Sequence, residues 1–166
     1  CIRDSWKIQS FLSDAGLKDQ VVFNLDFNRV KTGPRRGTMW LATSDGLHEY
    51  DGYAWRRYGR EQGLPSEFVR SVLVTREGVL WVGTDRGAGV YDGKTFQSFG
   101  SETGLAGPNV RRILEDRDGG IWFCCDSWPN AGTPGGLTSY KGGVWKTYRR
   151  ADGLPSDYVL NYFQSQ

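Results

Sequence analysis

Residues 63–103 read GLPSEFVRSVLVTREGVLWVGTDRGAGVYDGKTFQSFGSET, and close copies of this stretch lie on both sides of it. Gly104-Leu105 restarts the pattern 41 residues later, Gly16-Leu17 precedes it by 47 residues, and Gly153-Leu154 opens a further copy. Three tryptophans keep the period where other landmarks shift: Trp40, Trp81 and Trp122. Self-similarity at a period of about 40 residues is the signature of a propeller, solenoid or array.

One copy of the repeat contains four short strand patterns. Apolar residues recur within residues 69–74, 80–82, 89–91 and 96–99, and turn residues separate these runs. The pair Asp92-Gly93 is of the type that closes tight β-hairpins. Four hairpin-linked strands in roughly 40 residues make one β-propeller blade, whereas leucine-rich, ankyrin and tetratricopeptide repeats differ in period or need a helix. The sequence therefore predicts an all-β propeller of four-stranded antiparallel blades.

The repeats divide the chain into full and partial blades. We expect full blades at residues 16–62, 63–103 and 104–152, with the last strand of a preceding blade in 1–15 and the first strand of a following blade in 153–166. Closed propellers have about 4 or more blades. The chain is thus expected to be a single propeller segment. It is a piece of a longer protein, a ring completed by a second copy, or an open array that stacks head to tail.

The recurring aromatic residues indicate how the blades pack. A blade is a twisted sheet that buries both faces against its neighbours, so bulky side chains return at fixed places on its strands. We expect the three periodic tryptophans to fill the seams between blades. A tyrosine follows the tryptophan by ten residues in the first two copies and by eighteen in the third: Tyr50, Tyr91 and Tyr140. The third copy therefore carries an insertion.

Two insertions interrupt the repeats, on opposite rims. One lies around residues 30–38 and carries Arg35 and Arg36, and the other lies around residues 126–135 and carries Trp128. Because strand direction alternates in an antiparallel blade, the Trp128 insertion shares a rim with the Gly-Leu-Pro-Ser turns. The first insertion lies on the other rim.

Composition excludes several classes of function. The chain has 21 basic and 19 acidic residues without a basic block, so no nucleic-acid partner is expected. No apolar run approaches the roughly 18 residues of a membrane span, so we expect no membrane contact from this segment itself. The single histidine, His48, is expected on a strand surface, and no nucleophile and base pattern or phosphate loop is present. We expect neither an enzyme nor a bound metal or cofactor.

The cysteines and the turn aspartates have structural interpretations. Cys1, Cys124 and Cys125 are too few for a disulfide framework and lack metal-ligand spacing. The adjacent pair is expected to be buried packing, while Cys1 is either an exposed end or the lipidated first residue of a lipoprotein. The redox state of all three stays open. Aspartates near turn glycines are interpreted as turn formers: Asp45, Asp51, Asp85 and Asp92.

One pentapeptide carries a family resemblance. Leu80-Trp81-Val82-Gly83-Thr84, between Gly-Leu-Pro-Ser and Tyr-Asp-Gly, resembles the two-component regulator propeller repeats of bacterial extracytoplasmic sensors. Residues 39–43 and 121–125 are degraded forms of it, and the resemblance covers essentially the whole chain. It implies a non-catalytic periplasmic or extracellular sensor region, similar in several cases to carbohydrate-responsive sensors, that precedes a membrane span and a histidine kinase or cyclase. The same repeat also occurs in secreted and secretion-associated proteins.

The candidate ligand-binding residues are Arg70, Arg111, Asp126 and Trp128. The two arginines occupy the same repeat position at the start of an inner strand, and the insertion that begins at Asp126 overhangs that rim. An aromatic ring that stacks on a pyranose face, beside guanidinium groups, would suit a sugar or an acidic glycan. Alternatively, the arginines cap strand ends and Trp128 packs on its own blade.

Two classes of function remain. The first is a non-catalytic propeller that binds a small molecule, a glycan or a protein in a sensor. The second is a structural or assembly module of a secreted or cell-surface complex or filament, in which open blade ends or rims bind protein subunits or a second copy.

Overall fold

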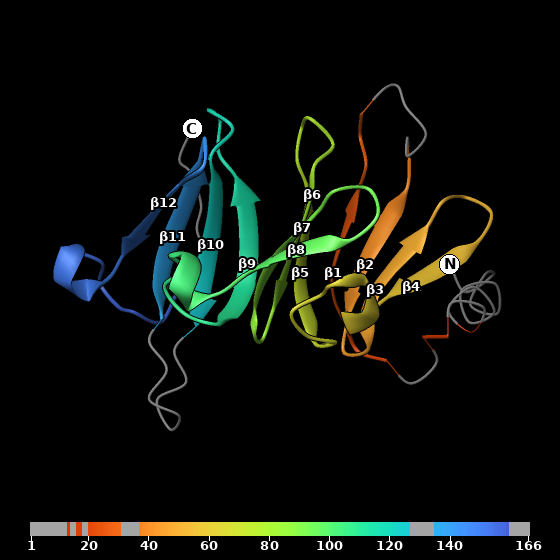
Figure 1. Ribbon diagram of the computed structural model, residues 1–166, viewed down its shortest axis with the longest axis horizontal. Coiled ribbons are helices and arrows are strands. Elements are labelled where there is room, and N and C mark those ends of the chain that lie inside the picture. Colours follow the sequence, from red (N-terminus) through yellow and green to blue (C-terminus); the bar gives the residue numbers. More distant parts are fainter. Residues whose placement is uncertain (1–12, 14–15, 18–19, 31–36, 127–134, 160–166) are drawn as a thin grey trace, which may run out of the picture.

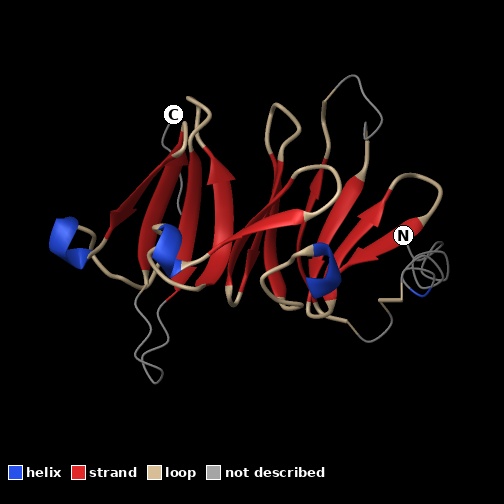
Figure 2. Ribbon diagram, in the orientation of Figure 1, coloured by secondary structure: helices blue, strands red, loops and turns tan. Residues whose placement is uncertain are grey.

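The computed structural model describes residues 13, 16–17, 20–30, 37–126 and 135–159. Within them, three four-stranded antiparallel sheets stand side by side in chain order (Figure 1; Figure 2). The first sheet is β1 (Val22–Phe27), β2 (Met39–Thr43), β3 (Gly46–Tyr50) and β4 (Trp55–Tyr58). The second is β5 (Val69–Val74), β6 (Leu80–Thr84), β7 (Gly87–Tyr91) and β8 (Phe96–Phe99). The third is β9 (Asn109–Glu115), β10 (Ile121–Asp126), β11 (Gly136–Lys141) and β12 (Val144–Tyr148). The predicted all-β architecture is confirmed.

Short 3₁₀ turns follow the outer strand of each sheet, which the sequence did not predict. They are η1 (Arg60–Gln62), η2 (Ser101–Thr103) and η4 (Arg150–Asp152). Each ends at a glycine with a left-handed backbone, for example Gly63 with φ of 91°, whose N–H bonds the carbonyl of Arg60. The expected positive φ before the repeated leucine is therefore present. No helix in the described part of the chain has the length and apolar character to cross a membrane.

Two apolar seams join the three sheets. In the first seam, between the first and second sheets, the buried Trp40 ring lies 5.7 Å from the ring of Tyr58. In the second seam, between the second and third sheets, the buried Trp81 ring lies 5.4 Å from each of the rings of Phe123 and Tyr140. The expectation that Trp40 and Trp81 fill the seams between blades is confirmed.

Trp122 differs from its two counterparts. It is only half-buried, and its ring stacks at 5.8 Å on Tyr148 of the same sheet. Its indole Nε1 donates a hydrogen bond of 2.7 Å to Asp116. Burial alone would raise the pKa of Asp116, but this bond and bonds from backbone N–H groups lower it below its usual value. The seam position of Trp122 stays a prediction, because no described sheet follows the third one.

The innermost strands β1, β5 and β9 are linked by side chains rather than by a ladder. Asn24 and Asp26 of β1 accept hydrogen bonds from backbone N–H groups of β5, each at 2.9 Å. Ser71 of β5 accepts the N–H of Ile113 in β9 at 3.1 Å. Edge strands otherwise leave such donors unpaired. These bonds fix the offset of each blade relative to the next along the strand direction. They therefore position the starts of the inner strands relative to one another.

The first seam also contains a buried polar pair. Glu49 is buried and accepts a hydrogen bond of 2.5 Å from the hydroxyl of Tyr58. Burial, together with the bond to this carboxylate and the neighbouring Tyr91, raises the pKa of Tyr58 above its usual value. Forty-one positions later, the second seam has Val90 and Phe99 in the same two places. The same two repeat positions therefore carry a polar contact in the first seam and an apolar contact in the second.

We expect Tyr58→Phe to lower the free energy of unfolding by about 1–3 kcal/mol, because it removes a partner from a buried carboxylate. A second change, Glu49→Val, reproduces the apolar pair of the second seam and should recover most of that loss. Urea denaturation of both single variants and the double variant measures the effect. A double variant as unstable as the sum of the singles would show that the pair is not coupled.

Cys124, Cys125 and His48 are buried. Cys124 and Cys125 are free thiols, and burial raises the pKa of the first to about 12 and of the second to about 11, so both are protonated at neutral pH. Their interpretation as packing residues is confirmed, while Cys1 lies outside the described residues. The expectation of a surface position is wrong for His48, because β3 is an interior strand whose faces are covered.

Candidate functional site

Each inner strand has the same irregularity near its start. The register skips one residue of the inner strand in all three sheets: Phe23 in β1, Arg70 in β5 and Arg111 in β9. These residues occupy one repeat position, 47 and 41 residues apart. A β-bulge of this kind kinks the strand and re-aims the extra side chain. Side chains of a strand alternate between the two faces of its sheet, and the bulge interrupts this alternation at the two arginines. Their side chains are therefore not held on a face of the blade.

The third sheet pairs its arginine with a buried acid. Arg111 Nε donates to Asp126 Oδ2 at 2.7 Å, and Asn109 Nδ2 lies 3.4 Å from the same oxygen. Asp126 and Asn109 are each only 2% exposed. Asp126 Oδ1 and Asn109 Oδ1 are also buried, and neither has a hydrogen-bond partner among the described residues. Two acceptors are therefore left without a donor.

The second sheet arranges the equivalent residues differently. The guanidinium carbon of Arg70 lies 4.9 Å from the ring centroid of Phe68 and 6.0 Å from that of Phe23, and the two rings are 4.9 Å apart. This arrangement gives Arg70 a cation–π contact. Buried atoms Arg70 Nε and Asp85 Oδ1 have no hydrogen-bond partner in the described part of the chain. The aromatic pair holds Arg70, and one donor and one further acceptor stay unsatisfied.

The charged residues of the second and third sheets interact electrostatically. Burial lowers the pKa of Arg70 below its usual value, and the positive charge of Arg111 adds to this effect. The negative charges of Asp85 and Asp126 oppose it. Two arginines and two aspartates from neighbouring blades therefore lie close enough to affect one another, and their formal charges sum to zero.

We call the whole group the inner-strand cluster. Its members are the bulged residues and their neighbours on the same rim: Phe23, Phe68, Arg70, Asp85, Asn109, Arg111 and Asp126. Together they contain two aromatic rings tilted by 49° to each other and, among the described residues, one donor and three acceptors without a hydrogen-bond partner. Buried polar atoms without partners cost free energy unless a ligand or water satisfies them. No group of three or more acidic, histidine or cysteine residues within the described ranges could hold a metal ion.

The structure brings together three of the four residues predicted for the site. Arg70, Arg111 and Asp126 are in the cluster, and Trp128 lies outside the described residues. Sequence reasoning missed four members: Phe23, Phe68, Asp85 and Asn109. The repeat period could have found two of them, since subtracting 41 from position 126 gives 85 and subtracting 47 from position 70 gives 23.

The turn aspartates divide into two kinds. Asp51 and Asp92 each accept two backbone N–H bonds from residues two and three positions ahead, and these bonds lower the pKa of both, so the turn-former interpretation is confirmed. For Asp85 the interpretation is wrong, because the hydroxyl of Thr84 makes the side-chain bonds of that turn. In the equivalent turn of the first sheet the hydroxyl of Thr43 makes these bonds, to the carbonyl of Gly46 and from the N–H of Asp45. The interpretation is therefore wrong for Asp45 too, whose carboxylate pairs with Arg57 at 2.8 Å.

Comparison with known proteins agrees with this architecture. Residues 63–86 and 104–127 match the two component regulator propeller family. No curated protein matches the chain. Among solved structures, the extracellular domain of a protein described as a hybrid two component system from B. thetaiotaomicron is similar at 24% identity and a TM-score of 0.60, over 79% of this chain and 18% of that one.

A second extracellular domain from a hybrid system of the same bacterium is 19% identical with a TM-score of 0.40, over 77% of this chain and 21% of that one. The chain spans about a fifth of the length of these solved domains. The likeness to the first of them supports a propeller fold.

Proposed function

Because the chain contains two-component regulator propeller repeats, we propose that it is a non-catalytic ligand-binding region of a bacterial extracytoplasmic sensor. Its place would then be the periplasm or the cell exterior. The observation that carries the proposal is the inner-strand cluster, where four buried polar atoms beside an aromatic pair have no partner among the described residues. A fold that needed only stability would gain by filling these positions with apolar side chains.

The chemistry of the cluster favours a neutral ligand with many hydroxyl groups, such as an oligosaccharide. Three unused acceptors call for a ligand rich in O–H donors, and the free Nε–H of Arg70 calls for a ligand oxygen. The faces of Phe23 and Phe68 offer an apolar surface of the kind on which a sugar ring packs. An acidic glycan suits the site less, because Asp126 already neutralises Arg111 at 2.7 Å.

Calorimetric titration with a panel of neutral and uronic-acid oligosaccharides tests this proposal. We expect Arg70→Met, which keeps an unbranched apolar side chain but removes the guanidinium donor, to weaken binding of the preferred neutral sugar about tenfold or more. The matched control is Arg57→Met, which removes an arginine from the surface of the first sheet. Equal affinity in both variants, or no binding by any neutral sugar, would overturn the proposal.

An assembly module is the second candidate, and the outer face of β1 favours it. Leu25 is 50% exposed there, whereas the same repeat position is 4% exposed at Val72 and 3% at Ile113. Val22 is 42% exposed, and its counterparts are fully buried: Val69 and Val110. The first sheet therefore presents a seam face without a neighbouring described blade. Sedimentation that depends on protein concentration, without sugar binding, would favour assembly over sensing.

A further inference from the structure

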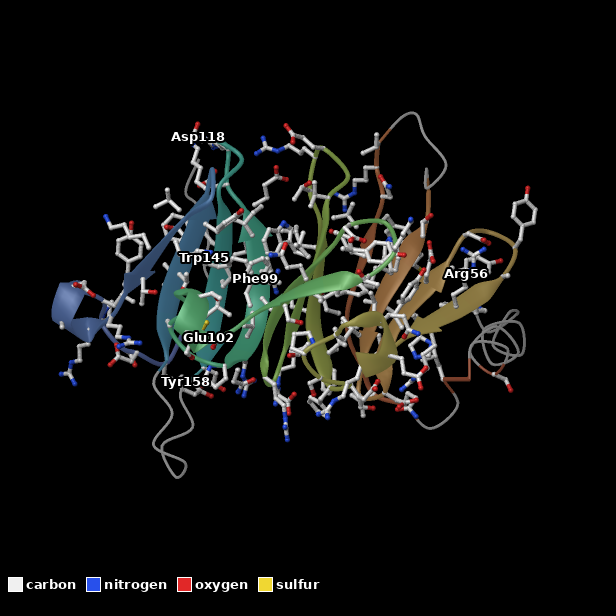
Figure 3. All side chains as sticks on the ribbon, in the orientation of Figure 1. Arg56, Phe99, Glu102, Asp118, Trp145 and Tyr158 are labelled. Carbon is white, nitrogen blue, oxygen red and sulfur yellow. The ribbon has the colours of Figure 1, made fainter. Side chains whose placement is uncertain are left out.

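A hollow lies at the opposite end of the inner strands from the inner-strand cluster. It is a cleft of about 440 Å³ between the second and third sheets. The rings of Trp81, Phe99 and Tyr140 line its base. Glu77, in the turn between β5 and β6, and Asp118, in the turn between β9 and β10, lie on its two walls. Figure 3 shows Asp118 at the tip of its turn and Phe99 on β8.

In the first seam, the segment that follows β1 fills the space equivalent to this cleft. A Cβ built on Gly78 would lie 2.9 Å from Cγ2 of Val30, so Val30 covers this turn. Gly119 is the same repeat position in the next blade, and a Cβ there would meet no atom within 4 Å. The two glycines have similar backbones, with φ of 85° and 76°. The second seam is therefore open where the first is filled.

The covering segment of the first seam continues directly from β1. The backbone N–H of Asn28 bonds the carbonyl of Thr38, and the Asn28 side chain accepts the N–H of Val30 at 3.0 Å. These bonds hold Val30 over the neighbouring blade. The connection from β5 to β6 instead closes at once, since Gly78 N–H bonds the carbonyl of Thr75 and Thr75 N–H bonds that of Val79. It is too short to cover the second seam.

Charge and exposure describe what would fit the open cleft. Val79 is an exposed apolar residue on its wall. Glu77 and Asp118 are exposed and form no ion pair with any described residue. The third wall carboxylate, Glu115, is paired with Arg76 at 3.3 Å, and Lys141 adds one basic side chain to the lining. An aliphatic side chain would fill the aromatic base, and an adjacent basic side chain would meet the two unpaired carboxylates.

We propose that this cleft is a docking site for a loop of a partner protein that presents an aliphatic residue next to a basic one. The chain itself provides the pattern, because Val30, which covers the first seam, directly follows Arg29. The proposal goes beyond ligand sensing, and it does not depend on the inner-strand cluster, which lies at the other end of the inner strands.

A peptide copied from the chain tests the proposal. The probe is acetylated and amidated DFNRVKT, the sequence of residues 26–32, titrated into the ¹⁵N-labelled chain. We expect shifts at the Trp81 indole and at Gly119. A peptide with Val30→Asp should not bind, and one with Arg29→Glu should bind about fivefold more weakly.

Protein variants localise the contact. Glu77→Gln with Asp118→Asn should weaken binding of the unchanged peptide about threefold to tenfold. Glu61→Gln with Glu102→Gln removes the same charge from two exposed positions in the 3₁₀ turns, and it should leave binding unchanged. Figure 3 labels Glu102. Shifts at Gly78 instead of Gly119, equal binding by the Val30→Asp peptide, or no shift at millimolar peptide would each overturn the proposal.

Discussion

Ile113→Ala is expected to lower the free energy of unfolding by about 2–5 kcal/mol. Ile113 is almost fully buried in the second seam, where Trp81 and Phe123 belong to the same apolar cluster. Truncation to alanine removes apolar surface and leaves a cavity between two sheets that relax only partly. Urea denaturation followed by tryptophan fluorescence measures the change, since Trp81 lies in this seam.

The matched control is Leu25→Ala at the same repeat position of β1. Half of Leu25 is exposed, so its truncation should cost less than about 1 kcal/mol. The two substitutions remove a similar number of methylene groups from equivalent strands. Equal losses of stability in the two variants would show that burial in the seam does not determine the cost of truncation. The blade packing described above would then be wrong.

Gly87→Ala is expected to cost roughly 3 kcal/mol or more of the free energy of unfolding. Gly87 begins β7 with φ of 132°, a backbone that side-chain-bearing residues rarely adopt. An added Cβ would also collide with the carbonyl oxygen of Phe99 in β8. The equivalent glycines meet the same obstacle, at 2.6 Å from Tyr58 for Gly46 and 2.6 Å from Tyr148 for Gly136. Thermal unfolding with a fitted enthalpy measures the loss.

Gly93→Ala separates strain from collision. Gly93 lies in the hairpin that follows β7, with φ of 107°, and an added Cβ there meets no atom within 4 Å. It should therefore cost only about 1 kcal/mol, from the backbone alone. Equal losses at both positions would mean that backbone strain, and not close strand approach, explains why Gly87 is glycine.

The period of the tryptophans was enough to predict the blades, because strand number and turn positions follow from local patterns. It was not enough to predict burial at each copy. Trp40 and Trp81 are buried while Trp122 is half-exposed, although all three occupy one repeat position. Burial depends on whether a neighbouring blade covers the residue, and a repeat pattern contains no information about that neighbour.

The candidate site was predicted in part for a similar reason. Arg70 and Arg111 could be placed on one rim from strand direction alone. Their bulges could not be predicted, since a bulge is a register shift between two strands and leaves no residue type of its own. Asp85 was misread because an aspartate before a turn usually bonds the turn, and here Thr84 does so.

The inner-strand cluster links the repeat to the proposed function. Seam packing and the side-chain bonds between β1, β5 and β9 hold the three inner strands in place, and the bulges then bring charged side chains of two blades together. Rigid placement of polar groups lowers the entropic cost of binding a ligand. The cluster therefore fits a site whose polar atoms are completed by a ligand.

The Nε–H signal of Arg70 in a ¹H–¹⁵N spectrum tests that claim most directly. This donor is buried and has no partner among the described residues, so a ligand oxygen that completes the cluster must move its resonance. We predict a saturable shift of the Arg70 Nε–H signal on titration with the neutral oligosaccharide that binds best by calorimetry. Sugar binding that left this signal unmoved would contradict the account, because the ligand would then occupy another site.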